Sequence, residues 1–172
     1  RDPFHTATFS TETIVSLDDH NLLMRETQDV LGNTVVAESD YRVLQPYLIT
    51  DPNGNRAEAA FDVLGMVVGT AVKGKITENL GDNLSGFEAN LIQQQIDDFH
   101  DAPDPHTSAP TLLKEASTRI LYDLHRFYRS QQAHPNDPAQ WEAPYAATMA
   151  RETHAADPLS APIRICSSLA GV

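Results

Sequence analysis

Short runs of β-branched, aromatic and aliphatic residues alternate with turn-forming residues over the first 76 positions of the chain. Thr34–Val36, Tyr47–Thr50 and Met66–Val68 are such runs, and Arg56–Phe61 is a more polar one. β-branched and aromatic residues favour strands, whereas Asp, Asn, Gly and Pro favour the turns between them. The pattern predicts a series of antiparallel strands over residues 8–76, with one face toward water.

A ladder of aspartates divides these strands at a fixed step of 11 residues: Asp18, Asp29, Asp40, Asp51 and Asp62. One strand plus one turn fits this step, so two strands make a repeat of 22 residues. At three rungs the spacing Asp-x-x-Gly predicts a tight turn in which glycine takes a left-handed backbone conformation. The predicted structural turn residues are Asp29, Gly32, Asn33, Asp51, Gly54, Asn55, Asp62 and Gly65.

The pattern changes in residues 77–117, which we expect to form an insertion with one or two short helices. Leu91, Ile92, Ile96 and Phe99 recur at helical spacing and predict a helix over residues 87–99. Pro103 and Pro105 follow this helix and end it. Residues 111–116 are expected to add one further helical turn.

Residues 118–172 return to a strand-like pattern. Residues 118–129 alternate, with Arg119, Leu121 and Asp123 on one side and Ile120 and Tyr122 on the other, which predicts a strand. A loop over residues 136–141 carries the single tryptophan, and residues 145–154 are a last strand candidate. The predicted fold class is mainly β, with antiparallel hairpin repeats interrupted by the helical insertion.

The bulk composition excludes some partners. The 172 residues carry 12 basic and 24 acidic side chains, a net charge of −12, which repels nucleic acids and anionic membranes. Cys166 is the single cysteine, so no intramolecular disulfide forms. No apolar run reaches the length of a membrane-spanning helix. The chain begins at Arg1 rather than Met, and we expect it to be a piece of a longer polypeptide.

The aspartate ladder and its flanking residues resemble the YD repeats of bacterial RHS proteins. Residues 40–56 and 60–65, with their Asp-Tyr and Asp-x-x-Gly steps, look more specifically like the B component of Tc toxin complexes and its SpvB-like relatives. Residues 118–127 and 144–154 carry the same resemblance, which extends from about residue 18 to about residue 160. Such a relative would continue with a further strand and turn, so residues 163–172 form an atypical tail.

The resemblance implies a structural function. In that family the repeats wind into a hollow β-sheet shell that encloses a toxic C-terminal polypeptide until it is delivered through a pore. This chain would be a middle section of the wall of a secreted toxin component. Its partners would be the rest of the shell, the toxin cargo and a pore-forming subunit. We expect no catalytic residue, no cofactor and no metal site.

The ladder residues around Asp51 have two alternative interpretations besides a structural turn: a site of autoproteolysis and a calcium-binding loop. Asp51-Pro52-Asn53-Gly54 is similar to an Asp-Pro-x-Gly site of autoproteolysis, but it continues like an ordinary repeat turn. Asp51, Asn53, Asn55 and Asp62 also stand at positions 1, 3, 5 and 12 of a calcium loop. Position 6 of that loop requires glycine and is Arg56 here, which favours a hydrogen-bonded turn.

Other side chains suggest alternative functions. His100 and His106, in an acidic segment, or His125 with Asp123, are the candidates for a small metal-dependent hydrolase, and His154 follows Glu152. A β-rich adhesive or carbohydrate-binding module is the stronger alternative. Its stacking surface would come from five aromatic residues, with Trp141 and Tyr145 exposed to solvent: Tyr122, Phe127, Tyr128, Trp141 and Tyr145.

Overall fold

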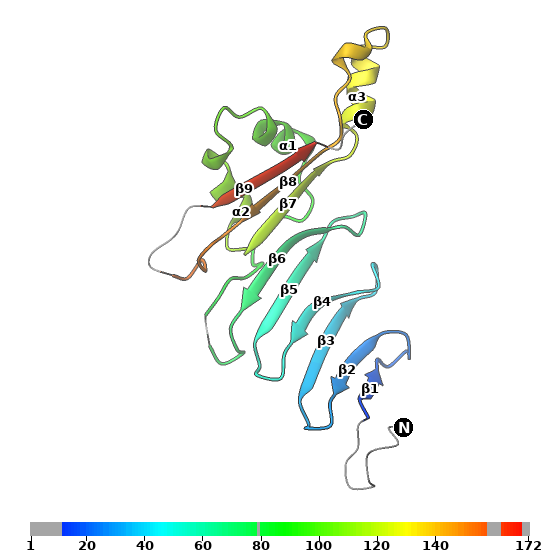
Figure 1. Ribbon diagram of the computed structural model, residues 1–172, viewed down its shortest axis with the longest axis vertical. Coiled ribbons are helices and arrows are strands. Elements are labelled where there is room, and N and C mark those ends of the chain that lie inside the picture. The colour runs from blue at the N-terminus through cyan, green and yellow to red at the C-terminus, as the bar shows by residue number, and fades with distance from the viewer. Residues whose placement is uncertain (1–11, 79, 158–162, 170–172) are drawn as a thin grey trace, which may run out of the picture.

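The chain forms one open, nine-stranded antiparallel sheet in which the strands follow their order in the sequence (Figure 1). The computed structural model describes residues 12–78, 80–157 and 163–169, and the side chains of all but the last three of these. The strands are β1 Ile14–Leu17, β2 Met24–Gln28, β3 Thr34–Asp40, β4 Gln45–Thr50, β5 Arg56–Phe61, β6 Val67–Lys73, β7 Thr118–Asp123, β8 Tyr145–Ala150 and β9 Arg164–Leu169. The predicted fold class is confirmed.

The helices are short and lie in two of the connections between strands. The β6–β7 connection contains α1 Gln93–His100 and α2 Ala109–Leu113, with the 3-10 turn η1 Pro105–Thr107 between them. The β7–β8 connection contains α3 Arg126–Ala133 and the 3-10 turn η2 Pro138–Gln140. Figure 1 shows α1 and α2 beside β7–β9, whereas α3 projects beyond the strands. No helix in the described part of the chain is long and apolar enough to cross a membrane.

The strand predicted over residues 118–129 is wrong beyond Asp123, because residues 126–133 form α3. Arg129 donates from Nη1 and Nη2 to the two carboxylate oxygens of Asp123, at 2.8 and 2.7 Å. This bidentate pair joins α3 to the last residue of β7. The alternation of residues 118–123 therefore corresponds to a strand, whereas the alternation of the residues after Asp123 does not.

The helix predicted over residues 87–99 begins later, at Gln93. Gly86 has φ +65°, and Phe87 packs its ring against β6, so the segment before Gln93 is irregular. The amide of Ile92 donates to Oε1 of Gln95 at 3.1 Å, which satisfies one N–H at the start of α1. Ile92 itself is 65% exposed rather than part of the buried helix face.

The hydrophobic core lies between the helices and one face of β7 and β8. It contains Phe99 of α1 and Leu112 and Leu113 of α2, packed against Leu121 and Met149 of the strands. We call this side of the sheet the covered face and the opposite side the open face. In β7 the covered face carries Arg119, Leu121 and Asp123, all of them buried. β1–β5, by contrast, have no fully buried side chain.

The register shows a β-bulge in every second strand pair of the first half of the sheet. The shifts lie between Ser16 and Leu17, between Glu38 and Ser39, and between Ala60 and Phe61. They recur every 22 residues, the length of the two-strand repeat. A bulge places two residues of one strand opposite one residue of its partner and increases the local twist.

Candidate functional site

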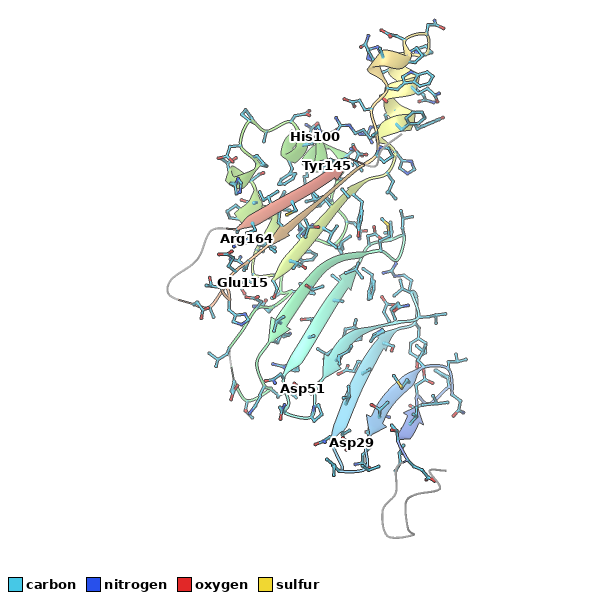
Figure 2. All side chains as sticks on the ribbon, in the orientation of Figure 1. Asp29, Asp51, His100, Glu115, Tyr145 and Arg164 are labelled. Carbon is cyan, nitrogen blue, oxygen red and sulfur yellow. The ribbon has the colours of Figure 1, made fainter. Side chains whose placement is uncertain are left out.

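The predicted turn residues lie in the connections along the two rims of the sheet. The first rim contains the β1–β2, β3–β4, β5–β6 and β7–β8 connections, and the second rim contains those between β2–β3, β4–β5, β6–β7 and β8–β9. Figure 2 shows Asp29 and Asp51 at the same side of the strip, with Glu115 and Arg164 further along it. The aspartate ladder thus alternates between the rims.

Asp29 organises the β2–β3 turn through its carboxylate. Oδ1 of Asp29 accepts from the amides of Leu31 and Asn33 at 2.8 and 2.9 Å, and Oδ2 accepts from Nδ2 of Asn33 at 2.7 Å. The amide of Gly32 donates to the Asp29 carbonyl at 3.1 Å, and Gly32 has φ +84°. The left-handed glycine lets the chain reverse without a clash at Cβ.

The β4–β5 turn repeats the same contacts. Asp51 Oδ1 accepts from the amides of Asn53 and Asn55, both at 2.8 Å, and Oδ2 accepts from Asn55 Nδ2 at 2.9 Å. Gly54 has φ +84° and donates to the Asp51 carbonyl at 2.9 Å. Asp51 is therefore bonded to the amides of its own turn, which is the arrangement of an Asx turn.

The first rim uses the same aspartate chemistry with more varied partners. Asp62 Oδ1 accepts from the amides of Leu64 and Met66, both at 2.9 Å, and Gly65 has φ +83°. In the β3–β4 turn Leu44 takes the left-handed position at φ +56°, and in the β1–β2 turn Asn21 does so at +55°. In all five turns the aspartate carboxylate thus accepts hydrogen bonds from backbone amides of the residues that follow it.

These hydrogen bonds favour the ionised carboxylates. The side-chain amide of Asn33 is the main cause that holds the pKa of Asp29 below its ordinary value, and Asn55 does the same for the pKa of Asp51. The pKa of Asp18 is lowered chiefly by the hydroxyl of Tyr41. A carboxylate that accepts several hydrogen bonds is harder to protonate.

Neighbouring turns of the first rim are bonded to one another. Tyr41 donates its hydroxyl to Oδ2 of Asp18 at 2.7 Å, which joins the β3–β4 turn to the β1–β2 turn. Arg42 donates from Nη1 to the Asp62 carbonyl at 2.6 Å, which joins the same turn to the β5–β6 turn. The amide of Val63 donates to Oδ1 of Asn90 at 2.9 Å and ties this turn to the insertion.

The second rim is joined in the same way, but through different residues. Arg56 donates from Nε to the Gly74 carbonyl at 3.0 Å, linking the start of β5 to the loop after β6. Asp82 is 4% exposed and accepts from the hydroxyl of Ser117 and, at 2.6 Å, from the amide of Ala155. The carboxylate of Asp82 therefore holds the β6–β7 and β8–β9 connections together.

A stacked cluster fixes the insertion to the centre of the sheet. Gly69 of β6 is paired with Arg119 of β7, and the ring of Phe87 covers both. A Cβ at Gly69 would lie 2.3 Å from Phe87 Cζ, and the Arg119 guanidinium carbon lies 3.8 Å from the ring centroid. Arg119 is 1% exposed, and burial lowers its pKa to about 10. The residue pattern predicted the face of Arg119 but not its partners.

The calcium and autoproteolysis interpretations find no matching geometry. Asp51 and Asp62 lie at opposite ends of β5, on different rims, and each is bonded within its own turn. A six-residue strand separates them by roughly 20 Å, so they do not share a calcium ion. Among the residues that the structure describes, no three His, Cys, Asp or Glu side chains gather around one possible metal position.

The histidines proposed for a hydrolase are dispersed. His100 pairs with Asp101 at 2.8 Å, and His106 pairs with Asp104 at 3.0 Å. His154 lies 3.4 Å from Asp82, and Ser117 bonds the same carboxylate oxygen rather than the imidazole. This order places a carboxylate between the serine and the histidine, so it does not form a Ser–His–Asp relay.

The five aromatic residues do not form one stacking surface. Tyr145 is 8% exposed and packs edge-on against His100, so the expected exposure of Tyr145 is wrong. Trp141 packs edge-on against Phe127 at 5.8 Å and donates Nε1 to the His134 carbonyl at 2.9 Å. Tyr122 donates its hydroxyl to the Val67 carbonyl at 3.2 Å. These contacts hold connections and strands together.

Comparison with solved structures finds this fold within Tc toxins. The chain matches a crystal structure of TcdB2-TccC3-TEV with a TM-score of 0.64, and one of TcdB2-TccC3-Cdc42 with a TM-score of 0.63. It also matches a Photorhabdus luminescens Tc holotoxin pore with a mutation in TccC3, with a TM-score of 0.64. The identity is 16% in each case, and the match covers 94% of this chain but 9% of the other.

No protein-family model matches the sequence, and no curated protein does. The likeness is therefore one of three-dimensional structure, and a shared fold does not by itself assign a function. It confirms, at the level of fold, the resemblance to Tc toxins that the motifs indicate. The chain has the fold of a segment of the TcdB2-TccC3 toxin structures.

Proposed function

We propose that this chain is a wall segment of an RHS-type β shell that encloses a toxic C-terminal polypeptide and helps to deliver it. The supporting observation is the open sheet itself, whose successive turns are bonded to one another along both rims. Contacts of this kind stiffen a strip without closing it around a pocket. The match to Tc toxin structures over 94% of the chain supports the same function.

In this proposal the three predicted segments have different functions. Residues 1–76 are the repeat strip of the wall, and residues 77–117 are an insertion that covers one face. Residues 118–172 continue the wall. The partners are the remainder of the shell at the two outer strands, the enclosed cargo, and a pore-forming toxin subunit during delivery. The complete component is a secreted, non-enzymatic part of a virulence or insecticidal toxin.

A chimaera tests this function. The segment of TcdB2-TccC3 that matches this chain is replaced by residues 12–169, and protease is added to the purified particle. We expect the C-terminal polypeptide to be digested no faster than in the unmodified particle, because the wall stays continuous. The measurement is the half-life of that polypeptide on a gel.

A second chimaera, from which Ala59 is deleted, is the matched control. Deleting one residue of β5 exchanges the two faces of the strand beyond that point and disrupts its pairing. We expect the cargo to be digested rapidly in this control. Rapid digestion in the first chimaera as well, in a particle that still assembles, would show that the chain is not a wall segment.

A further inference from the structure

A pocket opens at the first rim, between the β5–β6 turn, the insertion and β7, and its volume is about 220 Å³. Its walls are mainly apolar and include Leu64 of the turn, Leu91 and Ile96 of the insertion, and Leu121 of β7. Leu64 is 67% exposed, whereas Leu121 belongs to the core, so the pocket runs inward from the surface of the rim. An apolar cavity of about 150 Å³ holds a benzene molecule, so this pocket has room for a ring and a short chain.

Arg119 lines this pocket and has an unsatisfied donor. The residue is 1% exposed, and its Nη2 donates to the Glu88 carbonyl at 2.7 Å. Nε of Arg119 has no hydrogen-bond partner, and among the described residues it is the single buried side-chain nitrogen or oxygen of which this is true. A buried donor without an acceptor is costly, and folded proteins contain few of them. The wall of the pocket therefore lacks one acceptor.

The charge of Arg119 is also unbalanced. No carboxylate of the described residues forms an ion pair with it: Asp123 is bonded to Arg129 and Gln93, and Glu88 is exposed and offers Arg119 its carbonyl. Burial lowers the pKa of Arg119 to about 10, against an opposing effect of the Glu88 charge, so the guanidinium stays charged at neutral pH. A buried cation without an anion is destabilising, and an anion bound beside it would offset part of that cost.

We propose that this pocket binds a small monocarboxylic acid with an aromatic or branched aliphatic body. The carboxylate accepts from Nε of Arg119, and the body packs against Leu64, Leu91 and Ile96. The ring of Phe87 covers one face of the guanidinium at 3.8 Å, but the N–H groups lie in the guanidinium plane and stay available to an acceptor. This binding site is additional to the proposed wall function and does not depend on it.

The combination of an apolar wall and one cation favours a free acid over an inserted side chain. Asp and Glu side chains carry the charge without an apolar body, and Phe or Leu side chains carry the body without the charge. A small acid supplies both groups within the volume of the pocket. The net charge of −12 repels anions from the molecule as a whole, so a preference for an acid over its neutral analogue reports on a local cation.

Titration of the complete chain with matched ligands tests the site. Hydrocinnamate and isocaproate are the acids, their primary amides are neutral analogues of the same shape, and acetate carries the charge without the body. We expect a dissociation constant on the order of 0.1 mM for at least one acid, measured by calorimetry or by ligand-observed NMR. Its amide and acetate should bind about tenfold more weakly. Equal binding of acid and amide, or no binding of either acid at about 5 mM, would overturn the proposal.

Leu64 and Leu31 provide matched variants, because each directly precedes the left-handed glycine of its turn. Leu31 is 83% exposed and does not line the pocket, and since both side chains are exposed, both variants should fold. Leu64→Glu places a like charge at the pocket, and we expect it to weaken acid binding at least about tenfold more than Leu31→Glu does. Equal affinities in the two variants would overturn the site, as would unchanged acid binding in a folded Arg119→Met variant.

Discussion

At the scale of single residues, an aspartate and a glycine act together in the three turns that begin at Asp29, Asp51 and Asp62. The carboxylate satisfies amides that the reversal of the chain leaves without a strand partner, and glycine supplies the left-handed backbone. Both requirements are local, because the amides bonded to Asp29, Asp51 and Asp62 lie within four residues of each aspartate. This explains why the turns could be predicted from the spacing of residue types.

Replacing Gly32 by alanine isolates the backbone requirement. No atom lies within 4 Å of the position that a Cβ would take, so the cost comes from the φ of +84° alone. We expect Gly32→Ala to lower the free energy of unfolding by about 1–2 kcal/mol in urea titrations. Gly32→Asn is the control and should cost less, because asparagine tolerates this conformation better. An unchanged stability in Gly32→Ala would contradict the turn assignment.

The lowered pKa of Asp51 makes a prediction about acid stability. Its folded-state pKa lies below the ordinary value of 3.8, so the stabilisation is complete above that value and is lost as the pH falls through the folded-state pKa. We expect Asp51→Asn to reduce the loss of unfolding free energy between pH 7 and about pH 3. Asn53→Ala, in the same turn, is the control, because it leaves the Asp51 carboxylate and its bonds to the Asn53 amide and to Asn55 in place. Equal pH profiles for Asp51→Asn and the wild-type chain would contradict the prediction.

At the scale of elements, distant side chains decide where the regular pattern stops. Residues 118–123 alternate as a strand does, and the next residues continue to alternate, yet the strand ends at Asp123, whose carboxylate pairs with Arg129 of α3. Residues 87–92 have helical spacing, but Phe87 packs against Gly69 instead. Neither partner could be predicted from a local pattern. The bonds between turns, such as that of Tyr41 to Asp18, join residues 23 apart and were missed for the same reason.

The Arg129–Asp123 pair is predicted to hold α3 to the sheet. Asp123 is 4% exposed, and burial raises its pKa, but the bonds from Arg129 and Gln93 outweigh burial and leave the pKa below its ordinary value. Arg129→Ala leaves a buried carboxylate without its cation, and we expect a loss of about 3 kcal/mol in unfolding free energy. This is the lower end of the usual range, because the Arg129 side chain is 38% exposed.

Arg126→Ala is the matched control for this pair. Arg126 also makes a two-pronged ion pair, but its partner Glu142 is 54% exposed. We expect that loss to be below about 1 kcal/mol, as for other exposed pairs. Adding Asp123→Ala to Arg129→Ala should restore part of the stability. Similar losses in the two single variants would show that burial of Asp123 is not the cause.

At the scale of the whole molecule, the sheet is continuous but its support is uneven. β7 and β8 pack against α1 and α2 and contain the core, whereas β1–β5 have no fully buried side chain. Local stability follows the burial of apolar surface, so the two halves should open independently. The sheet therefore combines a supported region with a strip that depends on its rims and on further partners.

Hydrogen exchange of the isolated chain tests this division. We expect the amides of β7 and β8 to exchange slowest and those of β1 and β2 fastest, measured by mass spectrometry of proteolytic peptides. Leu113→Ala removes a fully buried side chain and should lower the stability of the supported region by about 2–5 kcal/mol. Exchange in β2 and β3 should stay unchanged. Uniform acceleration over all strands would show one cooperative unit instead.

The recurring bulges have a geometric consequence for a longer sheet of this kind. Within β1–β6, each two-strand repeat contains one extra residue, which lies near the first rim and in the second strand of the pair. An extra residue lengthens a strand by about 3.3 Å and bends it. Because the increment recurs at the same place, its effects add up rather than cancel. The curvature of such a wall therefore depends on the number of bulges, and its radius changes when a repeat loses or gains one.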